Sequence, residues 1–460
     1  MGMIGFVLVT SLLMAAPAAA TAAPAPDVRV TTLGNGLSVL LAPDSTALTV
    51  DVSVWYRAGA RQEPPGQSGI ARLLGRLMFR GTARHPAGDH ARLIQTEGGS
   101  VNTILNADYS CFSETVPPGA LELALGLEAE RMRGLTLAAP VVDAERAALA
   151  AQQRQAKSAL ELGLDRLYAL AFPGDPYGRP LDGTPADLPR LTAEVVQRFY
   201  RARFAPENAM VCVVGRFEPA PTLAAVRRLF GALPRGAAAA SKAGAKAPAR
   251  PPANRPVAVQ KGARRAVLAL DAPTPVLIAG WRTPGAGDSD RVAYEVMSRL
   301  LTGGASARLP RTLTGQGRAF VRAQGGFEPN GQASMLYCVL PSRPGTDTTF
   351  AEQAMVTEVE RLAEEPVAPA ELERARRQLE SEILFGWQAA RVRGQSLGAA
   401  QFVAGDYRKA WGRLERLRAL SADDVQRAAA RALIPDHRNV VWLMPRAGTP
   451  SGPGGSGGGR

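Results

Sequence analysis

"SGIARLLGRLMFRGT", residues 68–82, predicts a short amphipathic helix. Its apolar residues recur at the i, i+3, i+4, i+7, i+8 spacing that places side chains on one stripe of a helix: Ile70, Leu73, Leu74, Leu77 and Met78. Ser68 stands where a side-chain oxygen can cap the first turn. We therefore expect a helix whose apolar stripe packs into the core of a domain.

The second face of this helix combines two cations with a residue that has no side chain. Its members are Arg72, Gly75, Arg76 and Phe79. A glycine inside a helix costs about 1 kcal/mol relative to alanine. Helix stability therefore does not explain Gly75, and the face needs an explanation from function or packing.

Length and composition describe an ordinary globular protein. A chain of 460 residues predicts two to four domains, and 46% of the residues are hydrophobic and 21% charged. The formal net charge is +13, yet only five of the 54 basic residues are lysine and the arginines are spread without a run. This pattern favours solvated arginine-rich surfaces, and we expect no nucleic-acid partner.

The first residues have the pattern of a secretory signal peptide. An apolar run spans residues 4–16 and is followed by Ala-x-Ala steps, so residues 1–23 are expected to be removed. The run is shorter than the ~20 apolar residues of a membrane span, and no later stretch is long and apolar enough. We expect an exported protein, periplasmic or secreted, with no membrane span.

Cysteine and histidine are scarce. Cys111, Cys212 and Cys338 stand in apolar, strand-like contexts, which predicts buried free thiols rather than disulfides or a metal site. His85 and His90 are five residues apart, a spacing that does not align them on one helical face, so we expect a surface loop there. No local motif supplies a histidine-based metal site.

The order of predicted elements occurs twice. Residues 28–43 predict a hairpin, and residues 48–59 alternate apolar and polar residues, which predicts a strand with one buried face. The helix-strand unit that begins at Leu191 is echoed by the one at Leu420, and two Glu-Arg pairs recur at nearly the same offset, 130–131 in 360–361 and 145–146 in 373–374. We infer a tandem duplication.

The predicted fold class is α+β, with two tandem homologous domains, each a mixed, largely antiparallel sheet packed with helices. We place the first domain at residues 27–234 and the second at residues 257–446. An Ala/Pro-rich linker joins them at residues 235–256, and a Gly-rich tail follows at residues 447–460.

These residues resemble the insulinase/pitrilysin family of zinc metallopeptidases, in particular bacterial two-domain members similar to subunits of mitochondrial processing peptidase. The resemblance rests on stretches that occur in the family's order: "NGLSVLLAPD", "VSVWYRAGARQEPPGQSGIARLLGRLMFRGT", "LIQTEGGSVNTILNADYSCFSETVP", "LELALGLEAERMRGL", "RFAPENAMVCVVGRFEP" and "ELERARRQLESEILFG". It spans nearly the whole chain after the signal segment.

The resemblance implies that the zinc site is lost. In active members the helix carries His-x-x-Glu-His, in which two histidines bind zinc and the glutamate activates water. Those positions are Arg72, Gly75 and Arg76 here, and a third ligand, a glutamate further along, falls at Gln152. Arginine offers no lone pair to a metal and glycine offers no base. We expect no zinc, no other cofactor, no catalytic residue and no enzymatic activity from this chain alone.

The substrate-binding features of the family are only partly present. A segment that holds substrate with an arginine and a tyrosine corresponds to residues 313–320, where the arginine position is Thr314, or Arg311 in a shifted register, and the tyrosine position is Phe320. The stretch "GGSVN" precedes a strand whose edge pairs with substrate in the family, with Asn102 and Thr103 on it. Alternatively, Asn102 serves only a local backbone hydrogen bond.

Two main hypotheses and one remote one follow for the function. The preferred one is a catalytically inactive subunit that pairs with a zinc-bearing homologue to form a peptide-processing chamber, with unfolded peptides as further partners. The alternative is a stand-alone structural or peptide-binding scaffold with no peptidase partner. A third, remote hypothesis is an enzyme that uses other residues.

Overall fold

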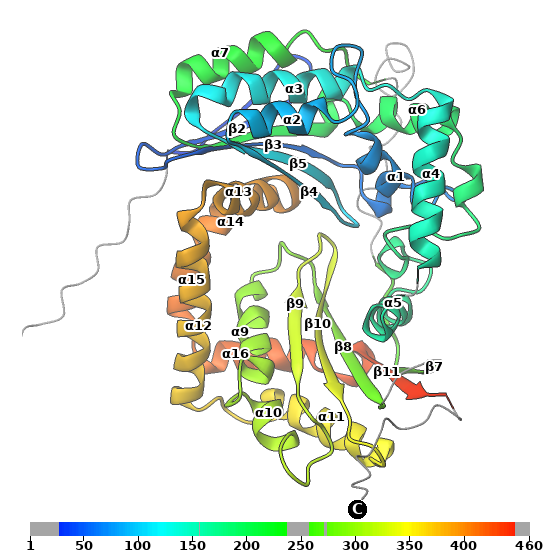
Figure 1. Ribbon diagram of the computed structural model, residues 1–460. Coiled ribbons are helices and arrows are strands. Elements are labelled where there is room, and N and C mark those ends of the chain that lie inside the picture. Colours follow the sequence, from blue (N-terminus) through cyan, green and yellow to red (C-terminus); the bar gives the residue numbers. More distant parts are fainter. Residues whose placement is uncertain (1–26, 156, 237–256, 271–273, 447–460) are drawn as a thin grey trace, which may run out of the picture.

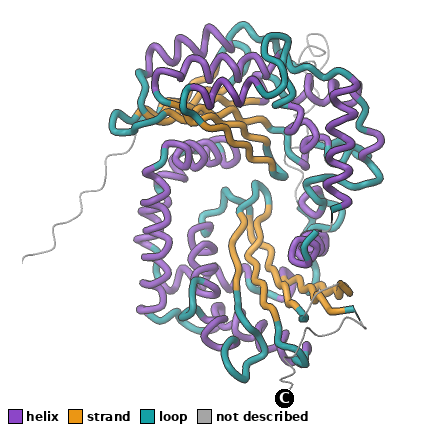
Figure 2. Tube along the Cα trace, viewed as in Figure 1, coloured by secondary structure: helices purple, strands orange, loops and turns teal. Residues whose placement is uncertain are grey.

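The computed structural model describes residues 27–155, 157–236, 257–270 and 274–446. Two sheets, each packed with helices, face each other across the molecule and are joined by helices on both sides (Figures 1 and 2). The predicted signal peptide, nearly all of the predicted linker and the predicted tail lie outside the described residues.

The first sheet has six strands in the order β1-β2-β6-β3-β5-β4. Their bounds are β1 (Arg29–Thr32), β2 (Ser38–Pro43), β3 (Val50–Tyr56), β4 (Ser100–Leu105), β5 (Ser110–Val116) and β6 (Ala209–Gly215). The predicted hairpin is confirmed, because β1 and β2 pair antiparallel. Only β2 and β6 run parallel, so the sheet is mixed and largely antiparallel.

The helices of the first half, apart from the one at Ala159–Ala171, cover one face and one end of this sheet (Figure 1). They are α1 (Ile70–Leu77), α2 (Asp89–Thr96), α3 (Leu121–Arg133), α4 (Ala139–Arg154), α5 (Ala159–Ala171), α6 (Ala193–Arg203) and α7 (Pro219–Phe230). The apolar stripe predicted for residues 68–82 is buried in the core of this half, with Ile70, Leu73 and Leu74 fully inaccessible.

The second sheet repeats the first. Its order is β7-β11-β8-β10-β9, which matches β2-β6-β3-β5-β4 strand for strand, including one parallel pair. The bounds are β7 (Arg264–Leu270), β8 (Val276–Pro284), β9 (Gln324–Glu328), β10 (Ala333–Pro341) and β11 (Arg438–Pro445). The predicted α+β fold with two repeated units is therefore confirmed.

The helices of the second half follow the same plan. They are α9 (Arg291–Thr302), α10 (Arg308–Leu313), α11 (Thr348–Glu364), α12 (Pro369–Gln388), α13 (Ala390–Ala404), α14 (Arg408–Trp411), α15 (Arg413–Ala419) and α16 (Ala422–Ala432). Within the described ranges, no helix is both long and apolar enough to cross a membrane.

In each half, one helix packs on the sheet of the other half. α13 lies under the first sheet, where a Cβ added at Gly398 would be 2.5 Å from the Trp55 ring (Figure 1). α5 lies on the second sheet, where a Cβ added at Gly163 would be 2.4 Å from Ile278. The expectation that the strand at residues 48–59 buries one face is wrong, because α13 covers the second face and all of β3 is buried.

Candidate functional site

The first turn of α1 is held by a residue that sequence reasoning missed. The prediction that Ser68 caps this helix is wrong. The N-cap residue is Gly69, whose φ of 92° lies in the left-handed region, and the helix has no side-chain cap at that position. Instead, the buried Glu63 carboxylate accepts a hydrogen bond from the Ala71 N–H at 3.1 Å. Burial raises the pKa of Glu63 to about 7.

Gly75 has a packing explanation. A Cβ built on this glycine would lie 2.5 Å from Cδ1 of Leu105, at the end of β4. The Leu105 side chain therefore occupies the space beside Gly75, and a larger residue at this position requires the Leu105 side chain to adopt another rotamer.

Arg76 lies among the polar side chains of α4. Its Nε donates to Glu145 Oε2 at 2.8 Å and its Nη1 donates to Gln152 Oε1 at 3.3 Å. Arg80 pairs with the other oxygen of Glu145 at 2.5 Å. Glu145 is 5% exposed, so this carboxylate is buried between two guanidinium groups. The structure thus brings together two of the four predicted positions, Arg76 and Gln152.

Glu145 was missed by sequence reasoning. It precedes Gln152 by seven residues, and this spacing places both side chains on one face of α4. The seven-residue spacing was the sequence feature that could have identified Glu145 as a neighbour of Gln152.

Arg72 points to a different partner. Its Nε lies 3.0 Å from Asp182 Oδ1, in the segment that follows α5. Arg72 and Arg76, one turn apart on α1, are thus each paired with a different carboxylate, and Arg76 shares its carboxylate with Arg80. Of the four positions, two carry guanidinium groups, one is a glycine and one carries a neutral amide. This set of side chains does not fit zinc.

Asn102 and Thr103 lie on β4, which is the edge strand of the first sheet. They stand opposite Ser113 and Phe112 of β5, and both side chains are half-buried. Among the described residues, no strand pairs with the outer edge of β4, so its backbone groups can receive another strand.

The segment at residues 313–320 lies apart from this edge. Phe320 is fully buried in the core of the second half, and Thr314 Oγ1 donates to the Pro310 carbonyl at 2.7 Å. Phe320 therefore has no exposed surface with which to contact a peptide.

A buried charge cluster packs beside β5. The expectation that His90 lies in a surface loop is wrong, because it belongs to α2, is 8% exposed and has Nε2 2.9 Å from Glu114 Oε1. Arg131 donates to Glu114 at 3.0 Å and from Nε to Glu128 at 2.8 Å. Burial lowers the pKa of His90 to about 3 and raises that of Glu128 to about 8.

This cluster is an ion-pair network rather than a metal centre. The ligand atoms of His90, Glu114 and Glu128 lie within 4.8 Å of one another, but the Arg131 guanidinium donates to both carboxylates. A metal ion would have to displace a fully buried arginine. A glutamate inside the apolar strand at residues 110–116 was the only sequence signal for this network.

Comparison with known families agrees with the folded arrangement. Residues 38–185 match the Insulinase (Peptidase family M16) domain, and residues 190–379 match the Peptidase M16 inactive domain. The chain belongs to the insulinase family, peptidase M16. The resemblance predicted from the sequence is confirmed.

Relatives of this M16 chain match it along most of its length. An uncharacterized zinc protease of Mycobacterium tuberculosis is 28% identical over 443 residues, which cover 93% of this chain and 95% of the relative. A probable mitochondrial-processing peptidase subunit beta of Arabidopsis thaliana is 24% identical, with 88% of this chain and 76% of the relative covered.

Two solved structures share the fold of this M16 chain. A protease from Helicobacter pylori superposes with a TM-score of 0.83 at 24% identity, covering 91% of this chain and all of that one. A peptidase M16 inactive domain from Pseudomonas fluorescens gives 0.79 at 19% identity, covering 92% and 98%. At these identities the similarity shows the fold alone.

Proposed function

We propose that this chain is a non-catalytic subunit that pairs with a zinc-bearing homologue and helps to form a chamber in which peptides are processed. The observation that carries the proposal is Arg76, whose guanidinium contacts Glu145 and Gln152, the latter at the position of the family's third ligand. A cation held there by a buried carboxylate opposes the binding of a second cation.

The packing of α1 supports the same conclusion. The Leu105 side chain fills the space beside Gly75, so a base at this position requires that side chain to turn away. The fold is nevertheless complete, with both repeated sheets and both exchanged helices in place. A chain that keeps the scaffold and has lost its ligands suits the supporting half of a two-chain peptidase.

Peptide binding is the activity that this half can retain. Strand addition at β4 depends on backbone groups rather than on particular side chains, and Asn102 and Thr103 lie on that edge. We propose that an unfolded peptide pairs there. Export by the segment at residues 1–23 would place this chain in the periplasm or outside the cell, and a partner would need to be exported too.

Purification of the chain alone tests the absence of catalysis. We expect no zinc after dialysis against micromolar zinc, and no chelator-sensitive cleavage of unstructured peptides. Stoichiometric zinc together with cleavage that the chelator abolishes would contradict the proposal.

Co-purification tests the pairing. We expect a homologue from the same genome that keeps His-x-x-Glu-His to elute with this chain as one complex. If the chain elutes alone and associates instead with an unrelated assembly, the scaffold alternative holds.

A further inference from the structure

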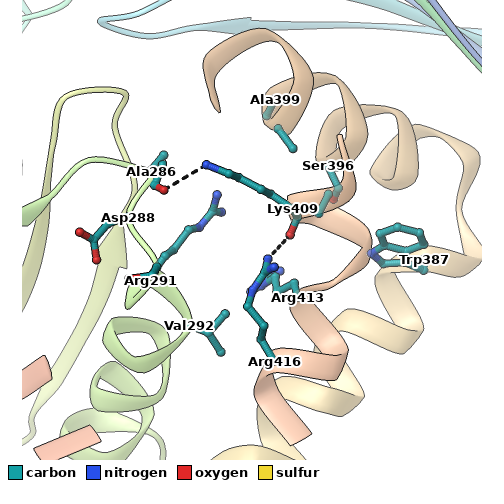
Figure 3. A pocket seen from close by; sticks show the side chains of 14 residues that line it. Ala286, Asp288, Arg291, Val292, Trp387, Ser396, Ala399, Lys409, Arg413 and Arg416 are labelled. Carbon is teal, nitrogen blue, oxygen red and sulfur yellow. Dashed lines mark hydrogen bonds between the residues drawn. The ribbon is translucent and has the colours of Figure 1, made fainter. Parts of the chain in front are cut away.

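A pocket of about 350 Å³ lies in the second half, between the start of α9 and the helices α13, α14 and α15 (Figure 3). Four cationic side chains from three of these elements line it: Arg291, Lys409, Arg413 and Arg416. Figure 3 shows the ends of Lys409 and Arg291 directed toward the same space. The pocket lies in the second half, apart from the degenerate zinc positions on α1.

The charges around this pocket do not cancel. Glu295, which lies behind it, pairs with both Arg291 at 3.2 Å and Arg413 at 2.7 Å. The lining carboxylate, Asp288, is itself 3.5 Å from Arg431. Glu295 therefore serves two arginines of the lining, and Asp288 pairs with a cation outside the lining.

Lys409 and Arg416 have no ion pair with a carboxylate of the described chain. Lys409 Nζ donates to the Gly287 carbonyl at 3.1 Å, and Arg416 donates to the Lys409 carbonyl. These hydrogen bonds satisfy N–H donors of the two side chains, but no carboxylate among the described residues balances their positive charges. A concave site with surplus positive charge attracts carboxylates.

Part of the remaining wall is apolar, beside Ser289 and Ser396. It includes the Trp387 ring, which packs against Trp411 with centroids 5.1 Å apart, and the side chains of Val292, Ala399 and Ala410. A carboxylate ligand that also carries apolar neighbours would use both parts of this surface. Free phosphate is more often held by converging backbone N–H groups, whereas the backbone groups bonded to these cations are carbonyls.

We propose that this pocket binds an acidic side chain of an extended peptide, with an adjacent apolar residue against Trp387. The inference rests on the proposed peptide-binding function and names a class of peptide for it: segments in which Asp or Glu adjoins an apolar residue. Lys409 and Arg416 select the acid, and the wall formed by Trp387 of α12 with Ala399 and Ala410 holds its neighbour.

Binding of matched peptides to the full chain tests this assignment. The probes are two short, end-capped fluorescent peptides of one sequence, which carry Glu next to Leu in one and Gln next to Leu in the other. Anisotropy is measured at low salt for the unaltered chain, for K409Q/R416Q and for R198Q/R427Q. The last variant removes the same charge from exposed arginines on α6 and α16 that do not line the pocket.

The unaltered chain should bind the Glu peptide about tenfold more tightly than the Gln peptide, since two ion pairs of ordinary strength together give about that factor. K409Q/R416Q should lose the difference, each single substitution should lose part of it, and R198Q/R427Q should keep it. Higher salt should reduce the difference.

Other results would overturn the assignment. Equal binding of both peptides by the unaltered chain would overturn it while leaving peptide binding in place. Selectivity that survives in K409Q/R416Q would place the acid elsewhere. Inorganic phosphate that binds more tightly than the Glu peptide would assign the pocket to a free anion. Binding of neither peptide would remove the proposed peptide-binding role together with this inference.

Discussion

Gly75 shows how a lost side chain becomes part of the packing. The Leu105 side chain of β4 packs into the space that a Cβ at this position would occupy. This contact ties α1 to β4, the strand proposed to receive a peptide. The composition of a degenerate site and the position of a binding edge are therefore coupled.

Gly75→Glu should lower the free energy of unfolding by about 1–3 kcal/mol, because the new side chain overpacks against Leu105. Urea denaturation measures the change. Gly126→Glu is the matched control: Gly126 lies on α3 with open space beside it, and the substitution should stabilise the helix slightly. Addition of Leu105→Ala to Gly75→Glu should recover part of the loss, and no recovery would contradict this explanation.

Restoring the motif on α1 should not restore catalysis. Arg72→His/Gly75→Glu/Arg76→His leaves Gln152 as a neutral third ligand and removes Arg76 from Glu145, which then faces only Arg80. We expect no zinc-dependent cleavage of an unstructured peptide. The same variant with Gln152→Glu is the comparison for zinc content and should bind more. Chelator-sensitive cleavage by the triple variant would count against this.

At the residue scale, sequence reasoning identified the unusual face of α1 because a mid-helix glycine and two arginines stand out against helix propensity. It could not identify Glu145 or Glu63 as partners. Those assignments depend on how α4 and the loop before α1 are placed against α1, and such placement is set by tertiary packing.

At the scale of elements, the exchange of α5 and α13 joins the halves. Each helix packs on the sheet of the other half through a glycine, Gly163 on Ile278 and Gly398 on Trp55. The contact between α13 and the first sheet also buries Cys212 and Phe402. The halves should therefore unfold together rather than as separate domains.

Gly398→Leu should loosen this joint. A side chain at this position meets three atoms of the Trp55 ring within 2.8 Å, so α13 must move away from β3. We expect faster hydrogen exchange of the β3 and β6 amides and a lower unfolding temperature. Gly126→Leu, with open space on α3, should leave the exchange of β3 unchanged. Unchanged exchange in Gly398→Leu would contradict the proposed joint.

Asp51 makes the same interface sensitive to pH. It is fully buried on β3, accepts a hydrogen bond from Thr115 at 3.1 Å and faces Gly394 of α13. Burial raises its pKa to about 7, against the attraction of Arg391, so the folded state holds a proton that the unfolded state has released. Its contribution to stability is therefore present at low pH and declines as pH rises toward 7.

Asp51→Asn should remove this dependence. The free energy of unfolding of the unaltered chain, relative to Asp51→Asn, should fall by roughly 2 kcal/mol between about pH 5 and about pH 8. Urea titrations at both pH values measure it. A difference that is constant with pH, or that grows as pH rises, would contradict a raised pKa at Asp51.

Which elements form could be predicted from apolar periodicity and from the repeat, because the second copy follows the order of the first. The sheet that each helix covers could not be predicted from these patterns. The alternation at residues 48–59 indicates one core-facing side, but it carries no information on a helix that arrives from some 340 residues further along. The exchange of α5 and α13 depends on contacts between residues that are far apart in the sequence.

At the scale of the whole molecule, an intact family scaffold holds a site without ligands. The repeated sheets, the exchanged helices and the edge strand persist, whereas the four positions of the zinc motif hold Arg72, Gly75, Arg76 and Gln152. The fold of the family is thus present, whereas the residues at these four positions do not fit zinc. The proposed role as a supporting subunit is consistent with both observations.

Titration of a zinc-bearing homologue with this chain tests that claim most directly. The measured quantity is the rate of chelator-sensitive peptide cleavage at fixed homologue concentration. We predict low activity for the homologue alone, a rise as this chain is added and saturation at a one-to-one ratio. Full activity of the homologue alone, unchanged by addition of this chain, would contradict the account.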